Sequence, residues 1–100
     1  MIEIRDDSGQ ARYEILVDGE LAGFADYTLR PGVISFTHTE VSPPFGGRGL
    51  AGELIGFALE DARARGLDVL PFCPFVRRFI ANNHEYLDLV PADQRDRFDL

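Results

Sequence analysis

One hundred residues with 45% hydrophobic content suffice for one hydrophobic core but not for two. The formal net charge of −7 has the wrong sign for binding nucleic acid, and no apolar stretch approaches the roughly 20 residues of a membrane span, so neither is an expected partner. A single cysteine, Cys73, excludes an internal disulfide, and residues 1–10 (MIEIRDDSGQ) have no signal-peptide pattern, so we expect one cytoplasmic domain spanning residues 1–100.

The first 41 residues show the alternation of apolar and polar side chains that is typical of β-strands. Residues 11–17 (ARYEILV) alternate, Asp18-Gly19 provides a turn, and residues 21–30 (LAGFADYTLR) continue the hairpin. Residues 33–41 (VISFTHTEV) alternate again, with one face formed by Ile34, Phe36, His38 and Glu40. The sequence therefore predicts three antiparallel strands before residue 42.

The second half of the chain has a helical period. Apolar residues recur every three or four positions from Leu50 to Ala62, which predicts a helix of about four turns that Gly66 ends. Residues 67–72 (LDVLPF) predict a short buried strand. Pro74 begins a second helical pattern, whose apolar face consists of Phe75, Phe79 and Ile80.

A strand, loop, helix and strand in this order place the two strands parallel to each other. The predicted fold class is therefore α/β (α+β), with three antiparallel strands, a glycine loop, a helix, a parallel strand and a further helix. The last ten residues (PADQRDRFDL) are charged and weakly patterned.

The loop before the first helix contains residues 47–52 (GRGLAG), which match the dinucleotide-binding pattern G-x-G-x-x-G. That site requires a short loop and an acidic residue at the end of the second strand. Here Pro43 and Pro44 lengthen the loop, the second strand ends at Cys73-Pro74, and no G-K-[ST] sequence is present. Both NAD binding and a P-loop are therefore poor matches.

The glycines of this loop still indicate a function. Glycines at positions 46, 47, 49 and 52 cost about 0.5 to 1 kcal/mol each in backbone entropy where alanine could serve. A helix N-terminus presents unpaired N–H groups, and glycines allow a phosphate to approach them. The loop is a candidate pyrophosphate site, and the alternative is a tight turn after the two prolines.

The order of these elements resembles the GNAT superfamily of acetyl-CoA-dependent N-acetyltransferases. The motifs that carry the resemblance to its small single-domain branch are HTEV (38–41), FGGRGLAGEL (45–54), DARARGL (61–67), PFCPFV (71–76) and EYLDLV (85–90). The resemblance covers about residues 10–90 and implies a truncated GNAT-like fold, acetyl-CoA as the cofactor and an amine as the acetyl acceptor. Larger members have further strands and helices, so the acceptor site could be open to a protein acceptor or completed by another subunit of a homo-oligomer.

The resemblance also implies cofactor contacts. In the superfamily the loop reads Q/R-x-x-G-x-G/A and binds pyrophosphate through its amides, and here a glycine replaces the first glutamine or arginine. The expected contacts are the loop residues Gly46, Gly47, Arg48, Gly49, Leu50 and Ala51. The preceding strand is expected to bind the pantetheine arm through the backbone of Glu40 and Val41. Residues 83–86 are NHEY where this branch has HPEY, so no role is assigned to His84.

Cys73 is a candidate catalytic nucleophile. If Pro74 is the first helical residue, Cys73 occupies the N-cap, where the helix dipole and free amides favour a thiolate. It could then accept an acetyl group from CoA. The alternative is a small buried side chain that only packs between its proline and phenylalanine neighbours.

His38 and Glu40 lie two residues apart on one strand and therefore share a face, which makes them candidates for deprotonating an acceptor amine. The alternative is an ordinary solvated strand end. Arg77 and Arg78 could reach the phosphates of the cofactor, although two arginines on a short helix usually form a solvated face.

Two mechanisms and two classes of function remain open. The amine could attack the thioester directly, or Cys73 could carry the acetyl group first. The alternative to an enzyme is a non-catalytic CoA-binding or protein-interaction module. The acidic net charge favours a cationic acceptor, such as a polyamine or lysine-rich segment, and no metal site is expected.

Overall fold

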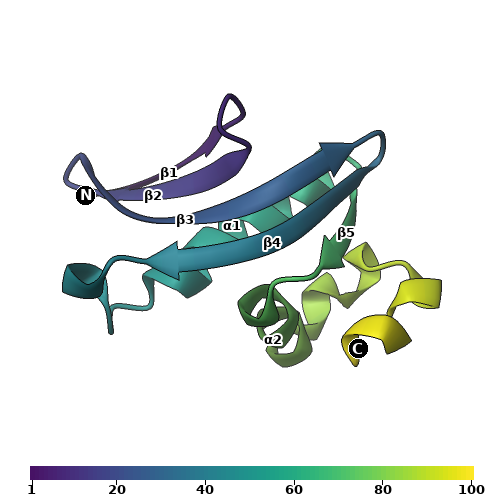
Figure 1. Ribbon diagram of the computed structural model, residues 1–100. Helices are drawn as coiled ribbons and strands as arrows, with labels where there is room; N and C mark the ends of the chain where they lie inside the picture. Colours follow the sequence, from purple (N-terminus) through teal and green to yellow (C-terminus); the bar gives the residue numbers. More distant parts are fainter.

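A five-stranded sheet forms the centre of the protein, and each strand pairs with the next one along the chain. The computed structural model describes residues 1–100. The antiparallel strands are β1 (Ile2–Asp7), β2 (Arg12–Val17), β3 (Glu20–Arg30) and β4 (Val33–Val41), and β5 (Asp68–Pro71) lies parallel to β4. Helix α1 (Leu50–Ala64) runs behind the long strands, and α2 (Pro74–Asn82) follows β5 (Figure 1).

The predicted fold class is confirmed, including the parallel pair formed by β4 and β5. The prediction of three antiparallel strands was too low by one, because it missed β1. This strand is at the edge of the sheet and has mostly exposed side chains, so it lacks the buried apolar face by which alternation identifies a strand. Its pairing with β2, in which Ile4 lies opposite Ile15, holds it in place.

The two helices cover the same face of the sheet. Six apolar side chains of α1 are buried there: Leu50, Leu54, Ile55, Ala58, Leu59 and Ala62. In α2, Val76 and Ile80 are buried, whereas the predicted face residues Phe75 and Phe79 are only partly covered. Phe79 packs against α1, where a Cβ on Gly52 or Gly56 would lie 3.8 Å from its ring.

The chain after α2 forms three 3₁₀-helical turns, η2 (His84–Leu89), η3 (Ala92–Gln94) and η4 (Asp96–Phe98), of which the last two lie in the charged C-terminal tail. Phe98 anchors the tail: it is 2% exposed, and its ring centroid lies 5.2 Å from that of Phe72. None of the helices has the length and apolar composition that crossing a membrane requires.

A β-bulge in β4 decides which side chains face the helices. Tyr27 of β3 lies opposite Phe36 and Asp26 lies opposite His38, so Thr37 is an extra residue in β4. One extra residue exchanges the two faces of the strand beyond it. Phe36 is buried under the helices, whereas His38 is exposed on the opposite side, which we call the open face. The prediction that Ile34, Phe36, His38 and Glu40 share one face is therefore wrong at the bulge.

Candidate functional site

Strands β4 and β5 separate halfway along β4. β5 pairs only with residues 33–36, and the last backbone contact is the Cys73 N–H donating to the Phe36 carbonyl at 2.8 Å. Pro71 has no N–H to continue the ladder, and Pro74 begins α2, so the chain turns away from β4. Beyond this point β4 is paired with β3 alone (Figure 1).

The unpaired side of β4, which we call its free edge, presents backbone groups. The Ser42 N–H donates to the Ala22 carbonyl of β3 at 2.8 Å. Because successive residues of a strand direct their N–H and C=O groups to opposite edges, Glu40 also pairs toward β3, and Thr39 and Val41 face the free edge. Of the two residues predicted to bind pantetheine through their backbone, Val41 is therefore at the free edge, and Glu40 has only its side chain available.

The free edge leads directly into the glycine turn. After Val41 come the short helix η1 (Pro43–Phe45) and a glycine-rich turn in which Gly47 and Gly49 have φ angles of 79° and 72°. Gly49 is the N-cap of α1, and a Cβ added to either glycine would meet no atom within 4 Å. This open space lies where side chains would otherwise stand, so a ligand can approach the backbone.

Backbone donors of α1 face this turn. The first bond inside the helix runs from the Glu53 N–H to the Gly49 carbonyl at 3.2 Å, so the N–H groups of Leu50, Ala51 and Gly52 have no acceptor within the helix. Arg48 is exposed, and its guanidinium lies 5.3 Å from the centre of the Phe45 ring. The turn combines free amides, the positive end of a helix and a nearby cation, which together suit a pyrophosphate.

Cys73 is the N-cap of α2, as predicted, and lies where β5 leaves β4. Only 3% of its surface is exposed, and its thiol donates a hydrogen bond to the Thr39 hydroxyl at 3.4 Å. The thiol is therefore close to the free edge but covered. Sequence reasoning did not single out Thr39, because it became a neighbour of Cys73 only through the bulge.

His38 and Glu40 lie together on the open face, on the opposite side of β4 from Cys73. The His38 Nε2 and Glu40 Oε1 atoms are 3.3 Å apart, and more than half of each side chain is exposed. The Phe24 ring lies 6.1 Å from the His38 ring, centre to centre. An amine approaching over the open face would meet this pair, which can accept a proton.

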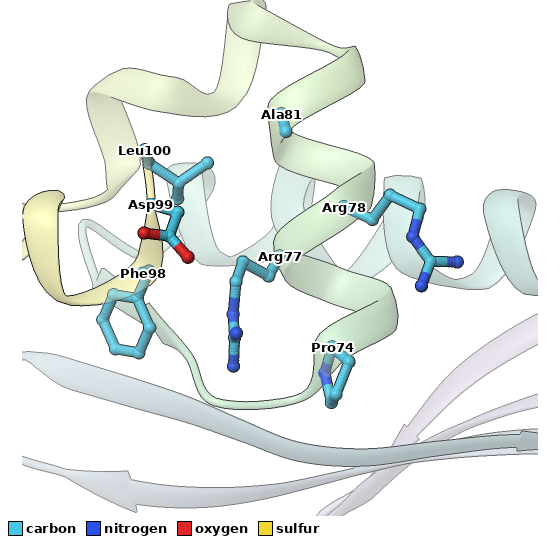
Figure 2. A pocket seen from close by; sticks show the side chains of 7 residues that line it. All are labelled: Pro74, Arg77, Arg78, Ala81, Phe98, Asp99 and Leu100. Atoms are coloured by element: carbon cyan, nitrogen blue, oxygen red, sulfur yellow. The ribbon is translucent and has the colours of Figure 1, made fainter.

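Arg77 and Arg78 have different environments. They line a hollow of about 260 Å³ between α2 and the C-terminal tail, and Figure 2 shows their side chains pointing in different directions. Arg77 donates to the Phe72 carbonyl at 3.1 Å and lies 5.9 Å from the centre of the Phe98 ring, so it ties the tail to β5. Arg78 is exposed.

Comparisons with known proteins agree with this geometry. Among solved structures, a GCN5-like protein from Staphylococcus aureus has the same fold, with a TM-score of 0.68 and 24% identity over 89% of this chain and 87% of that chain. The ribosomal-protein-alanine N-acetyltransferase from Brucella melitensis has a TM-score of 0.52 and 26% identity, over 60% of this chain and 45% of that chain. A search of curated proteins found no match.

The class of protein is also defined by a family model. The model for GCN5-related N-acetyl-transferases matches residues 12–89, which include every strand from β2 onward, the glycine turn and both α-helices. The chain therefore belongs to the GCN5-related N-acetyltransferase family, and the predicted resemblance is confirmed.

Proposed function

We propose that this protein is an acetyl-CoA-dependent N-acetyltransferase that transfers the acetyl group directly to an amine. The observation that carries the proposal is the continuity of two backbone features: the free edge of β4 and the open N-terminus of α1, joined by the glycine turn. An extended molecule with an amide-containing arm and a pyrophosphate matches both at once. The family of the chain agrees with this ligand.

In this proposal the glycine turn holds the pyrophosphate. The amides of Gly49, Leu50 and Ala51 donate to its oxygens, and Gly46 and Gly47 keep the approach clear of side chains. Arg48 adds a positive charge. The C=O groups of Thr39 and Val41 and the N–H of Val41 pair with the pantetheine arm, which directs the acetyl thioester to the separation of β4 and β5 and leaves the N–H of Thr39 unpaired.

Glu40 and His38 act on the acceptor side. Glu40, 3.3 Å from His38, takes a proton from the acceptor amine, directly or through a water molecule. The amine nitrogen then forms a bond to the acetyl carbonyl carbon, the carbon–sulfur bond breaks, and the CoA thiolate leaves. A free-edge N–H of β4 is available to the oxyanion that develops.

Direct transfer is preferred because Cys73 is covered. With 3% of its surface exposed and its thiol bonded to Thr39, a covalent route would first require this part of the protein to open. The prediction that Cys73 is catalytic can be tested cleanly, because all ten basic residues of the chain are arginines and no lysine side chain can be acetylated. After incubation with acetyl-CoA, intact-mass analysis should find the same number of acetyl groups on the wild-type protein and on the Cys73→Ser variant.

The first test of the cofactor is thermal unfolding with acetyl-CoA, with NAD and adenosine nucleotides as controls. A ligand at 100 times its dissociation constant adds about 2.7 kcal/mol to the free energy of unfolding, which raises the melting temperature of a domain this size by roughly 10–20 °C. A shift with acetyl-CoA and acetylation of a panel of amines would support the enzyme. A shift without any transfer would favour the non-catalytic CoA-binding module, and no shift would remove the basis of both.

A further inference from the structure

A groove of about 590 Å³ lies on the open face of β3, β4 and β5. Across its floor, Thr28, Ser35 and Leu70 lie side by side in register on the three strands. Thr37 and Phe72 line one end, at the point where β4 and β5 separate, and Arg30 lines the other. The volume is within the range of small-molecule sites.

The groove begins beside the proposed catalytic pair. Thr37 is the bulged residue directly before His38, and Phe72 directly precedes Cys73. An amine held at this end lies next to His38 and Glu40 on the same face of the sheet. The position of the groove therefore fits an acceptor, because the cofactor is assigned to the free edge and the glycine turn.

The charge of the groove is opposite to that of the protein. The chain carries a formal net charge of −7, yet no acidic residue lines this groove. Arg30 is exposed at its far end, and a second cation, Arg97, lies 4.8 Å from the centre of the Phe72 ring that forms a wall. These charges favour an acceptor that carries an anionic group at the far end of the groove. This expectation differs from the cationic acceptor that the net charge of the chain favours.

The length of the groove sets the distance between the reacting amine and the anionic group of the acceptor. Arg30 lies opposite Val33 in the ladder, and Val33 is four residues from Thr37 along β4. At about 3.3 Å per residue the two ends are on the order of 13 Å apart. A reacting amine and an anionic group held at these ends are separated by three to four residues of extended peptide.

We propose that the groove binds the acceptor and that the acceptor is a short peptide-like amine with a carboxylate on the order of 13 Å from its reacting nitrogen. The amine lies at Thr37, beside Glu40, and Arg30 pairs with the carboxylate. The hydroxyls of Thr28 and Ser35 lie on the floor of the groove, where they can form hydrogen bonds with the part of the acceptor backbone between its amine and its carboxylate. The inference rests on the proposed acetyl transfer for its chemistry but not for its binding site.

The test uses tetrapeptides with a free N-terminal amine, an amidated C-terminus, and glutamate, glutamine or arginine as the fourth residue. With acetyl-CoA, kcat/KM should be about two- to fivefold higher for the glutamate peptide than for the glutamine peptide, as expected for one ion pair at an exposed site. Arg30→Gln should abolish this preference. Arg78→Gln removes an exposed arginine outside the groove and should preserve it.

Binding of the same peptides, labelled at the C-terminus, is measured by fluorescence anisotropy without acetyl-CoA. Tighter binding of the glutamate peptide by the wild type and by Arg78→Gln, but not by Arg30→Gln, would support the groove even if no transfer occurred. Equal binding of all three peptides, or a preference for arginine, would overturn it. If the wild type and Arg30→Gln both acetylate the three peptides at equal rates, the proposed acetyltransferase activity is supported and the proposed acceptor is refuted.

Discussion

Replacing Gly49 by alanine should separate the cofactor role of the glycine turn from its structural role. Gly49 has a φ of 72°, a conformation that costs an L-residue roughly 1–2 kcal/mol. An added Cβ meets nothing within 4 Å in the free protein, so backbone strain is the whole structural cost. For a domain of this size, each kcal/mol corresponds to a fall of about 4–8 °C in melting temperature.

In the presence of acetyl-CoA the same Cβ would stand where the pyrophosphate approaches the helix. We expect Gly49→Ala to lose most of the stabilisation of roughly 10–20 °C that a saturating ligand provides. Gly66→Ala is the matched control, because Gly66 also has a positive φ, 67°, and equally open surroundings, but lies at the other end of α1. Differential scanning fluorimetry of both variants, with and without acetyl-CoA, gives the four values needed.

Both variants should be destabilised to a similar extent without ligand, and only Gly66→Ala should regain the full ligand-dependent rise. If Gly49→Ala also shows that full rise, the turn does not bind the pyrophosphate. If neither substitution lowers the melting temperature, the assumption about backbone strain is wrong instead, and the two failures can be told apart.

Three further predictions concern other parts of the molecule. Gly52→Ala should leave stability unchanged or raise it by about 0.5–1 kcal/mol in urea denaturation, because its Cβ would make an ordinary 3.8 Å contact with Phe79 and a helix favours alanine. Glu40→Gln should lower kcat by roughly 10²- to 10⁴-fold while the melting shift with acetyl-CoA persists, and an unchanged kcat would exclude Glu40 as the base. Burial and hydrogen bonds to Asp61 and Asp6 raise the pKa values of Tyr13 and Tyr27, so the folded protein holds these protons more tightly than the unfolded chain. The contribution of each of these tyrosines to stability should therefore be constant below the unfolded pKa of about 10 and fall above it by about 1.4 kcal/mol per pH unit, and Tyr27→Phe should remove one such contribution from the slope measured by urea denaturation above that pH.

Local patterns predicted most of the elements because each one depends on neighbours in the chain. The helix from Leu50 was visible in its apolar spacing, and Pro74 marked the start of α2 with Cys73 as its N-cap. The positive φ angles at Gly47 and Gly49 follow from the residue type. Strand β1 was missed because its stability comes from pairing with β2, and its own six residues carry no buried face.

The candidate site was predicted less completely. His38 and Glu40 were expected to be neighbours, which their separation of 3.3 Å confirms, because both follow the bulge and the two-residue period holds between them. Their position on the face opposite to Phe36 was not predicted. Neither was Thr39 as the partner of Cys73, nor the groove that ends at Arg30, because each requires knowing how distant strands align.

The sequence by itself determined the order of strands and helices, the glycine turn before α1 and the family to which the chain belongs. Tertiary structure alone decided that one extra residue, Thr37, is accommodated in β4, since nothing in VISFTHTEV distinguishes that threonine from its neighbours. The bulge is defined by the pairing of β4 with β3, in which Tyr27 lies opposite Phe36 and Asp26 opposite His38, and this alignment is a contact between separate segments of the chain. It turns the Thr39 side chain toward Cys73 and the Glu40 side chain toward the open face, so two residues of one short motif lie on opposite surfaces of the strand.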